Sequence, residues 1–91
     1  MPHFTLYARS YCHLCDDMLA ALQSLLDAQP APPQRVDVTV IDIDAAAEQG
    51  DPGPLARYDE LVPVLFGDLE GAPLCHYFLD EVAVRHWLAS Q

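Results

Sequence analysis

The sequence contains no lysine and only four arginines, against 14 aspartates and glutamates. The formal net charge of −10 at pH 7 argues against a nucleic-acid partner, because phosphate binding requires clustered cations. The same shortage of cations argues against binding to anionic membrane surfaces. We therefore expect a protein that contacts neither nucleic acid nor membrane.

Long apolar runs are missing as well, and no stretch approaches the roughly 20 residues of a membrane-spanning helix. The N-terminus has no basic region followed by a cleavable apolar stretch. Cysteine is scarce, and three cysteines leave one over after any pairing, which does not suit the disulfide framework of a secreted protein. These features predict a cytoplasmic protein. An apolar share of 52% is ample for one core, so residues 1–91 are expected to form a single domain.

Hydrophobic patterning and turn residues predict an alternation of strands and helices. The first two strands enclose a helix, which indicates a βαβ unit with parallel strands and a right-handed crossover. The last two strands form a hairpin, so the order βαβ-α-ββα predicts an α/β fold with a four-stranded mixed sheet and helices on both faces. The predicted segments are a strand at 3–8, a helix at 14–28, a proline-rich connector at 29–35, a strand at 36–43, a helical turn at 44–48, a short helix at 55–60, strands at 61–66 and 72–78, and a last helix capped by Asp80.

A pair of cysteines separated by two residues, Cys12 and Cys15, stands where the first predicted strand gives way to the first predicted helix. Free N–H groups and the positive end of the helix dipole stabilise a thiolate there. A protonated His13 adds to this stabilisation, whereas the nearby Asp16 and Asp17 oppose it weakly through water. We expect the pKa of Cys12 to lie below the free-thiol value of about 8.5. The pair indicates a redox-active dithiol.

On these residues, together with Val62-Pro63 before the predicted hairpin, the chain resembles the glutaredoxins of the thioredoxin-like fold. Within them it is most similar to small bacterial glutaredoxin-like proteins with a Cys-His-Leu-Cys-Asp stretch. The resemblance implies that Cys12 is the exposed nucleophile and that Cys15 is the more buried resolving cysteine. It also implies a cis peptide bond before Pro63 and a Val62 backbone that pairs with an extended thiol substrate.

The sequence departs from glutaredoxins in residues that bind glutathione. It has no Gly-Gly pair near the last helix, and Leu61 stands where a threonine is usual. Arg9 holds the place of a common lysine and is a candidate anchor for a substrate carboxylate. Tyr11 is expected to pack on the sheet edge or to shield the thiolate, and His13 lies between the cysteines. Arg9, Tyr11 and His13 therefore join Val62 and Pro63 as candidate substrate-binding residues.

The predicted function is thiol–disulfide exchange in cell redox homeostasis, with a protein disulfide or a small thiol as substrate. No cofactor is required; glutathione or a reductase is the candidate reductant, and a monomer is expected. One alternative is a non-catalytic binding module that docks thiol peptides at the Val62-Pro63 loop. Another is metal or iron–sulfur binding through Cys12 and Cys15, but zinc needs further ligands, and Cys75 and His76 lie far along the chain. No metal site is therefore predicted, and Cys75 is interpreted as a small core residue. The aromatic residues expected in the core or at its edge are Tyr58, Phe66, Phe78 and Trp87.

Overall fold

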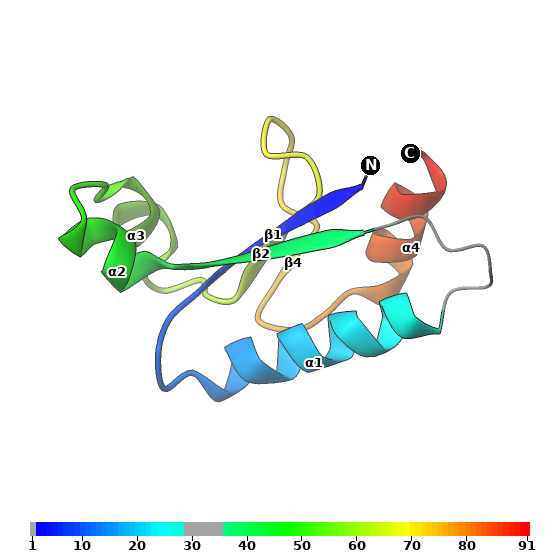
Figure 1. The fold of residues 1–91 in the computed structure, drawn as a ribbon, viewed down its shortest axis with the longest axis horizontal. Helices are drawn as coiled ribbons and strands as arrows, with labels where there is room; N and C mark the ends of the chain where they lie inside the picture. The colour runs from blue at the N-terminus through cyan, green and yellow to red at the C-terminus, as the bar shows by residue number, and fades with distance from the viewer. Residues whose placement is uncertain (1, 29–35) are drawn as a thin grey trace.

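The structure, a computed structural model, describes residues 2–28 and 36–91, and the predicted connector at 29–35 lies outside the described residues. Strands and helices follow the predicted order (Figure 1). None of the helices in the described ranges has the length and apolar character needed to cross a bilayer. The elements are β1 (His3–Ala8), α1 (His13–Asp27), β2 (Asp37–Asp42), α2 (Ile43–Glu48), α3 (Gly53–Tyr58), β3 (Val64–Phe66), β4 (Cys75–His76) and α4 (Glu81–Ala89).

The four strands form one mixed sheet in the order β2-β1-β3-β4. β1 and β2 are parallel, with His3 beside Asp37 at one end and Ala8 beside Asp42 at the other. β3 runs antiparallel to β1, and β4 antiparallel to β3. A parallel pair joined through α1, extended by a C-terminal hairpin, confirms the predicted sheet.

The helices α1 and α4 cover one face of this sheet. In Figure 1, α1 lies lengthwise along the sheet and α4 lies toward the end that is remote from α2 and α3. Alternate side chains of β1, Phe4 and Leu6, point toward this face because the side-chain repeat of a strand is two residues. The buried core on this side consists of Phe4, Leu6, Met18, Leu22, Leu25, Leu65 and Val84.

Trp87 packs α4 against the sheet. Its ring centroid lies 4.8 Å from that of Phe4. Gly67, the first residue after β3, lies so close to the indole that a Cβ atom there would overlap the ring. The close approach of backbone and indole therefore requires glycine at this position.

α3 packs against the opposite face of the sheet, near the end of β1. Tyr7 alternates with Leu6 along β1, so its side chain points away from α1. Tyr58, the last residue of α3, lies against it, with ring centroids 4.7 Å apart, and also contacts Phe66 at 5.9 Å. The prediction that helices lie on both faces is thereby confirmed.

The last strand is much shorter than its composition suggests. Only Cys75–His76 pair with β3, so the predicted strand at 72–78 is wrong in extent. Tyr77 has a φ of 65°, a left-handed conformation that an extended strand does not contain. Phe78 then turns outward and is 71% exposed, so the prediction that it belongs to the core or its edge is wrong.

Candidate active site

The two cysteines of the Cys-x-x-Cys stretch lie at the start of α1. Tyr11, with a φ of 58°, precedes the turn into the helix. Cys12 is the N-cap residue in an extended conformation, and its Sγ accepts a hydrogen bond from the N–H of Cys15 at 3.1 Å. The sulfur thus takes the place of an N-cap oxygen, where an N–H donor and the helix dipole favour negative charge.

Cys12 and Cys15 are joined by a disulfide, with their Cα atoms 5.2 Å apart. The two residues differ in their access to solvent. Cys12 is half-buried, whereas Cys15 is only 3% exposed. A molecule approaching from solvent therefore meets Cys12 first, and the pair can exchange between a disulfide and two thiols.

The loop before β3 lies at the same end of the sheet as the cysteines. Tyr7 pairs with Val64 in the antiparallel ladder, so the chain leaving β1 toward Cys12 runs beside the chain entering β3. The Val62–Pro63 peptide bond in this entering segment is cis. The structure therefore brings Cys12 and the Val62-Pro63 loop to one end of the domain.

Backbone hydrogen bonds hold this loop on both sides. The N–H of Val62 donates to the carbonyl of Tyr58 at 3.1 Å, and the N–H of Tyr77 donates to the carbonyl of Pro63 at 3.0 Å. The hydroxyl of Tyr77 also donates to the carbonyl of Glu60 at 2.6 Å. The Val62 N–H is thus already engaged within the chain.

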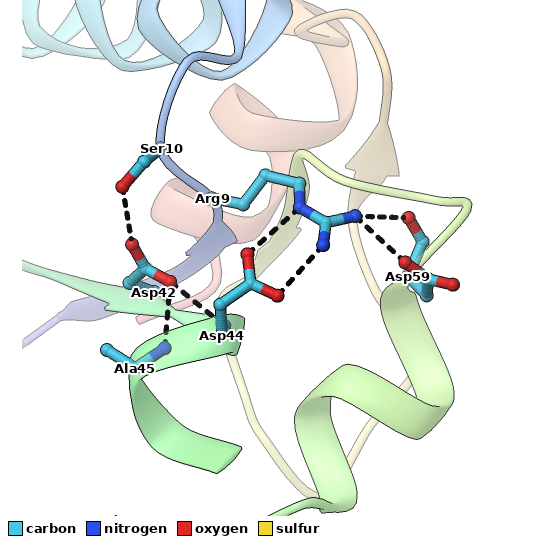
Figure 2. Close-up of polar contacts among 6 residues, drawn as sticks. All are labelled: Arg9, Ser10, Asp42, Asp44, Ala45 and Asp59. Carbon is cyan, nitrogen blue, oxygen red and sulfur yellow. Dashed lines mark hydrogen bonds and ion pairs between the residues drawn. The ribbon is translucent and has the colours of Figure 1, made fainter. Parts of the chain in front are cut away.

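Arg9 binds two carboxylates of its own chain, as Figure 2 shows. Its Nε and Nη2 donate to the two carboxylate oxygens of Asp44 at 3.1 and 2.8 Å. Its Nη1 donates to the carboxylate of Asp59 at 2.8 Å and to the Asp59 carbonyl at 3.3 Å. All three guanidinium nitrogens are occupied, so Arg9 ties the end of β1 to the first turn of α2 and to the C-cap of α3.

Asp42 forms a second polar link beside this one (Figure 2). Its Oδ1 caps α2 by accepting the N–H groups of Asp44 and Ala45 at 2.9 and 3.0 Å, and its Oδ2 accepts the hydroxyl of Ser10 at 3.0 Å. The hydrogen bond from Ala45 is the largest of the effects that hold the pKa of the Asp42 carboxyl below its ordinary value. Ser10 and Arg9 thereby connect the segment before Cys12 to α2.

Two other candidate residues flank the outer cysteine. Tyr11 and His13 are both exposed. The side chain of Tyr11 is exposed over its whole surface, so the expectation that it packs on the sheet edge is wrong. Their role in substrate binding stays a prediction.

A cavity of about 150 Å³ opens beside Cys15. Its volume suffices for a few water molecules, since each takes about 30 Å³ in the liquid. The inner cysteine therefore borders a hollow rather than close-packed apolar side chains on every side. The lining residues are Leu6, Ala8, Arg9, Ser10, Cys15, Asp16, Leu19, Val40 and Asp42.

The third cysteine, Cys75, lies half-buried on β4. Burial is the main cause that raises the pKa of its thiol above the ordinary value, which keeps it protonated and unreactive near neutral pH. Within the ranges that the structure describes, no three His, Cys, Asp or Glu side chains are grouped closely enough to hold a metal ion. Cys75 and His76 therefore do not complete a site with Cys12 and Cys15.

The family follows from a match over nearly the whole chain. Residues 3–89 match the model of the Glutaredoxin-like domain (DUF836). The chain belongs to this family. The glutaredoxin-like domain thus includes every strand and helix from β1 to α4, which agrees with the resemblance seen in the sequence.

Solved structures support the same assignment. The solution NMR structure of protein Ne2328 from Nitrosomonas europaea is 32% identical, with a TM-score of 0.68, and the alignment covers 94% of this domain and 89% of that chain. The X-ray structure of protein XcR50 from X. campestris is 31% identical, with a TM-score of 0.61, and 97% of each chain is covered. A malarial protein with 10% identity and a TM-score of 0.58 over 99% of this domain and 96% of that chain shares the fold alone. A search among curated proteins found no match.

Proposed function

We propose that this glutaredoxin-like domain is a thiol–disulfide oxidoreductase. The observation that carries the proposal is the hydrogen bond from the Cys15 N–H to the Cys12 sulfur at the N-terminus of α1. After reduction, the same N–H group and the helix dipole stabilise a thiolate on Cys12. Hydrogen bonds to charged groups contribute about 1.5–3 kcal/mol, which is more than the weak, screened opposition of an exposed aspartate such as Asp16.

The reaction is a two-step exchange that starts from the reduced protein. The Cys12 thiolate attacks one sulfur of a substrate disulfide, a mixed disulfide forms, and the other substrate sulfur leaves as a thiolate. Cys15 then gives its proton to solvent or to a departing thiolate and attacks the Cys12 sulfur. The Cys12–Cys15 disulfide forms, the substrate leaves as a dithiol, and two electrons have passed from the domain to the substrate. A thiol reductant, with glutathione or a reductase as the candidates, restores the dithiol.

The difference in burial supports this division of roles. The half-buried Cys12 is open to an approaching disulfide, whereas Cys15 is buried and lies next to the Cys12 sulfur that it would attack. An extended substrate would pair with the Val62 carbonyl, since the Val62 N–H already donates to Tyr58. Cytoplasmic location and a monomeric state stay predictions from the sequence.

A pH titration of alkylation, combined with a turnover assay, tests the proposal. In the reduced domain, the alkylation midpoint of Cys12 is expected below the free-thiol value of about 8.5, and the domain is expected to reduce insulin or a mixed glutathione disulfide. Cys15→Ser should accumulate a mixed disulfide with substrate, whereas Cys12→Ser should form none. A midpoint above the free-thiol value, without turnover, would instead favour a non-catalytic binding module.

A further inference from the structure

The surface around the proposed dithiol is assembled from segments that meet at one end of the sheet. β4 pairs with β3 through Val64 and His76, so the chain leaving β4 lies beside the chain entering β3. The start of α1, the Val62-Pro63 loop and the residues Tyr77 and Phe78, which leave β4, therefore lie toward the end of the domain at which Cys12 lies. The side chains on these segments are the ones that an approaching substrate meets.

Apolar side chains at this end are left uncovered. Phe78, two residues after the end of β4, is 71% exposed. Leu61 in the loop before β3 and Tyr11 next to Cys12 are exposed as well. Exposed large apolar side chains on neighbouring segments indicate a contact surface for another molecule.

Carboxylates surround these apolar side chains. Four exposed acidic residues lie on or next to the start of α1 and the loop before β3: Asp16, Asp17, Asp59 and Glu60. Charges of one sign around a site raise the local concentration of oppositely charged molecules and speed their association. This end of the domain therefore attracts a cationic substrate and repels an anionic one.

The arginines in the described part of the chain do not reverse this preference for a cationic substrate. The guanidinium of Arg9 already binds the carboxylates of Asp44 and Asp59. Arg85 lies 3.8 Å from Glu81 one turn earlier on α4. Arg57, in the last turn of α3, acts electrostatically on Tyr7, whose side chain is on the face opposite α1. Of the described arginines, Arg9 and Arg85 are thus paired with carboxylates of the chain, and Arg57 lies on α3, which packs on the face opposite α1.

We propose that the preferred substrate is a disulfide in a polypeptide segment whose neighbouring residues are basic and apolar. This inference rests on the oxidoreductase function proposed above. Glutathione disulfide carries more carboxylates than ammonium groups, so the acidic surround disfavours it. Leucine-like side chains of a polypeptide cover Phe78 and Leu61, and its lysines or arginines face the carboxylates.

The test measures how fast different disulfides oxidise the pre-reduced domain. Two peptides of equal length carry the same intramolecular disulfide and leucines, with lysines around it in one and glutamates in the other; glutathione disulfide is the third oxidant. The second-order rate constant is obtained by quenching with an alkylating agent and counting modified Cys12 and Cys15 by mass spectrometry. At an ionic strength of about 0.01 M, where charges act over about 30 Å, the basic peptide is expected to react at least about tenfold faster than the other two. At about 1 M salt, the two peptides should differ by less than about twofold.

Charge variants locate the preference. Asp17→Asn together with Glu60→Gln removes two carboxylates near the dithiol and is expected to reduce the rate ratio of basic to acidic peptide by about threefold or more. The matched control, Asp27→Asn with Glu70→Gln, removes the same charge at the far end of α1 and in the turn after β3, and should leave the ratio unchanged.

The outcomes separate the two proposals. If glutathione disulfide or the acidic peptide reacts as fast as the basic peptide at low salt, the substrate preference is overturned while the oxidoreductase function stands. An equal effect of the two double variants also overturns it, because net charge alone would then explain the ratio. If none of the three disulfides oxidises a domain whose cysteines count as free thiols, both proposals fail.

Discussion

Removal of the Arg9 guanidinium is expected to destabilise the domain because this side chain joins three separate segments. Arg9 makes a two-pronged contact with Asp44 and a further contact with Asp59, and the three side chains are 31%, 43% and 59% exposed. Partly exposed ion pairs contribute about 0.2–1 kcal/mol each, and two-pronged geometry places the Asp44 pair at the upper end. Arg9→Gln should therefore lower the Tm of a domain of this size by about 4–8 °C.

Lysine at the same position distinguishes geometry from charge. Arg9→Lys keeps the charge but loses the planar fork, so it should recover only part of the lost stability. In a double-mutant cycle with Asp44→Asn, followed by urea unfolding at low salt, the two changes together are expected to cost less stability than the sum of the two single changes. Additive losses in the cycle, with no change in Tm for Arg9→Gln, would refute the reasoning and leave Arg9 as a candidate substrate anchor.

Three further outcomes are expected. Gly67→Ala should lower the free energy of unfolding by about 1–3 kcal/mol, measured in urea, because the new methyl group overlaps the indole of Trp87. Gly71→Ala is the control, since a Cβ atom there has ordinary contacts. An equal loss of stability in both variants would contradict the explanation. The pKa of Asp42 is lowered in the folded protein, so its contribution to the free energy of unfolding is complete above the unfolded pKa of about 3.9 and is lost as the pH falls through the folded pKa. Asp42→Asn should reduce this loss of stability at acid pH, because asparagine does not take up a proton but can still cap α2. Cys75 of the reduced domain should be alkylated more slowly than Cys12 at pH 8, because burial raises its pKa; faster labelling of Cys75 would show that β4 opens.

The parts of the fold that depend on local pattern could be predicted from the sequence. β1 occupies the predicted residues, and α1 lies within one residue of its predicted ends. Asp80 caps α4 as predicted, because its carboxylate accepts the N–H of Ala83 three residues later. Capping and helical spacing act within a few residues, so a single sequence contains the information.

Features set by contacts between distant segments could not be predicted in this way. The partners of Arg9, Asp44 and Asp59, are 35 and 50 residues away, and no local pattern marks them among 14 acidic residues. The early end of β4 was missed for the same reason. The apolar residues after His76 resemble a strand, but the contact of Tyr77 with the loop before β3 overrides that local preference.

β2 is an edge strand of the sheet, and this position affects how readily the protein aggregates. A six-residue outer strand presents N–H and C=O groups to which a strand of another molecule can add, and this is a common start of aggregation. Here the chain carries a formal net charge of −10, so two copies brought edge to edge repel each other. The other edge strand, β4, has two residues and is too short a template. We expect concentrated solutions to stay clear near neutral pH and to become turbid on acidification, as protonation removes the mutual repulsion of the copies.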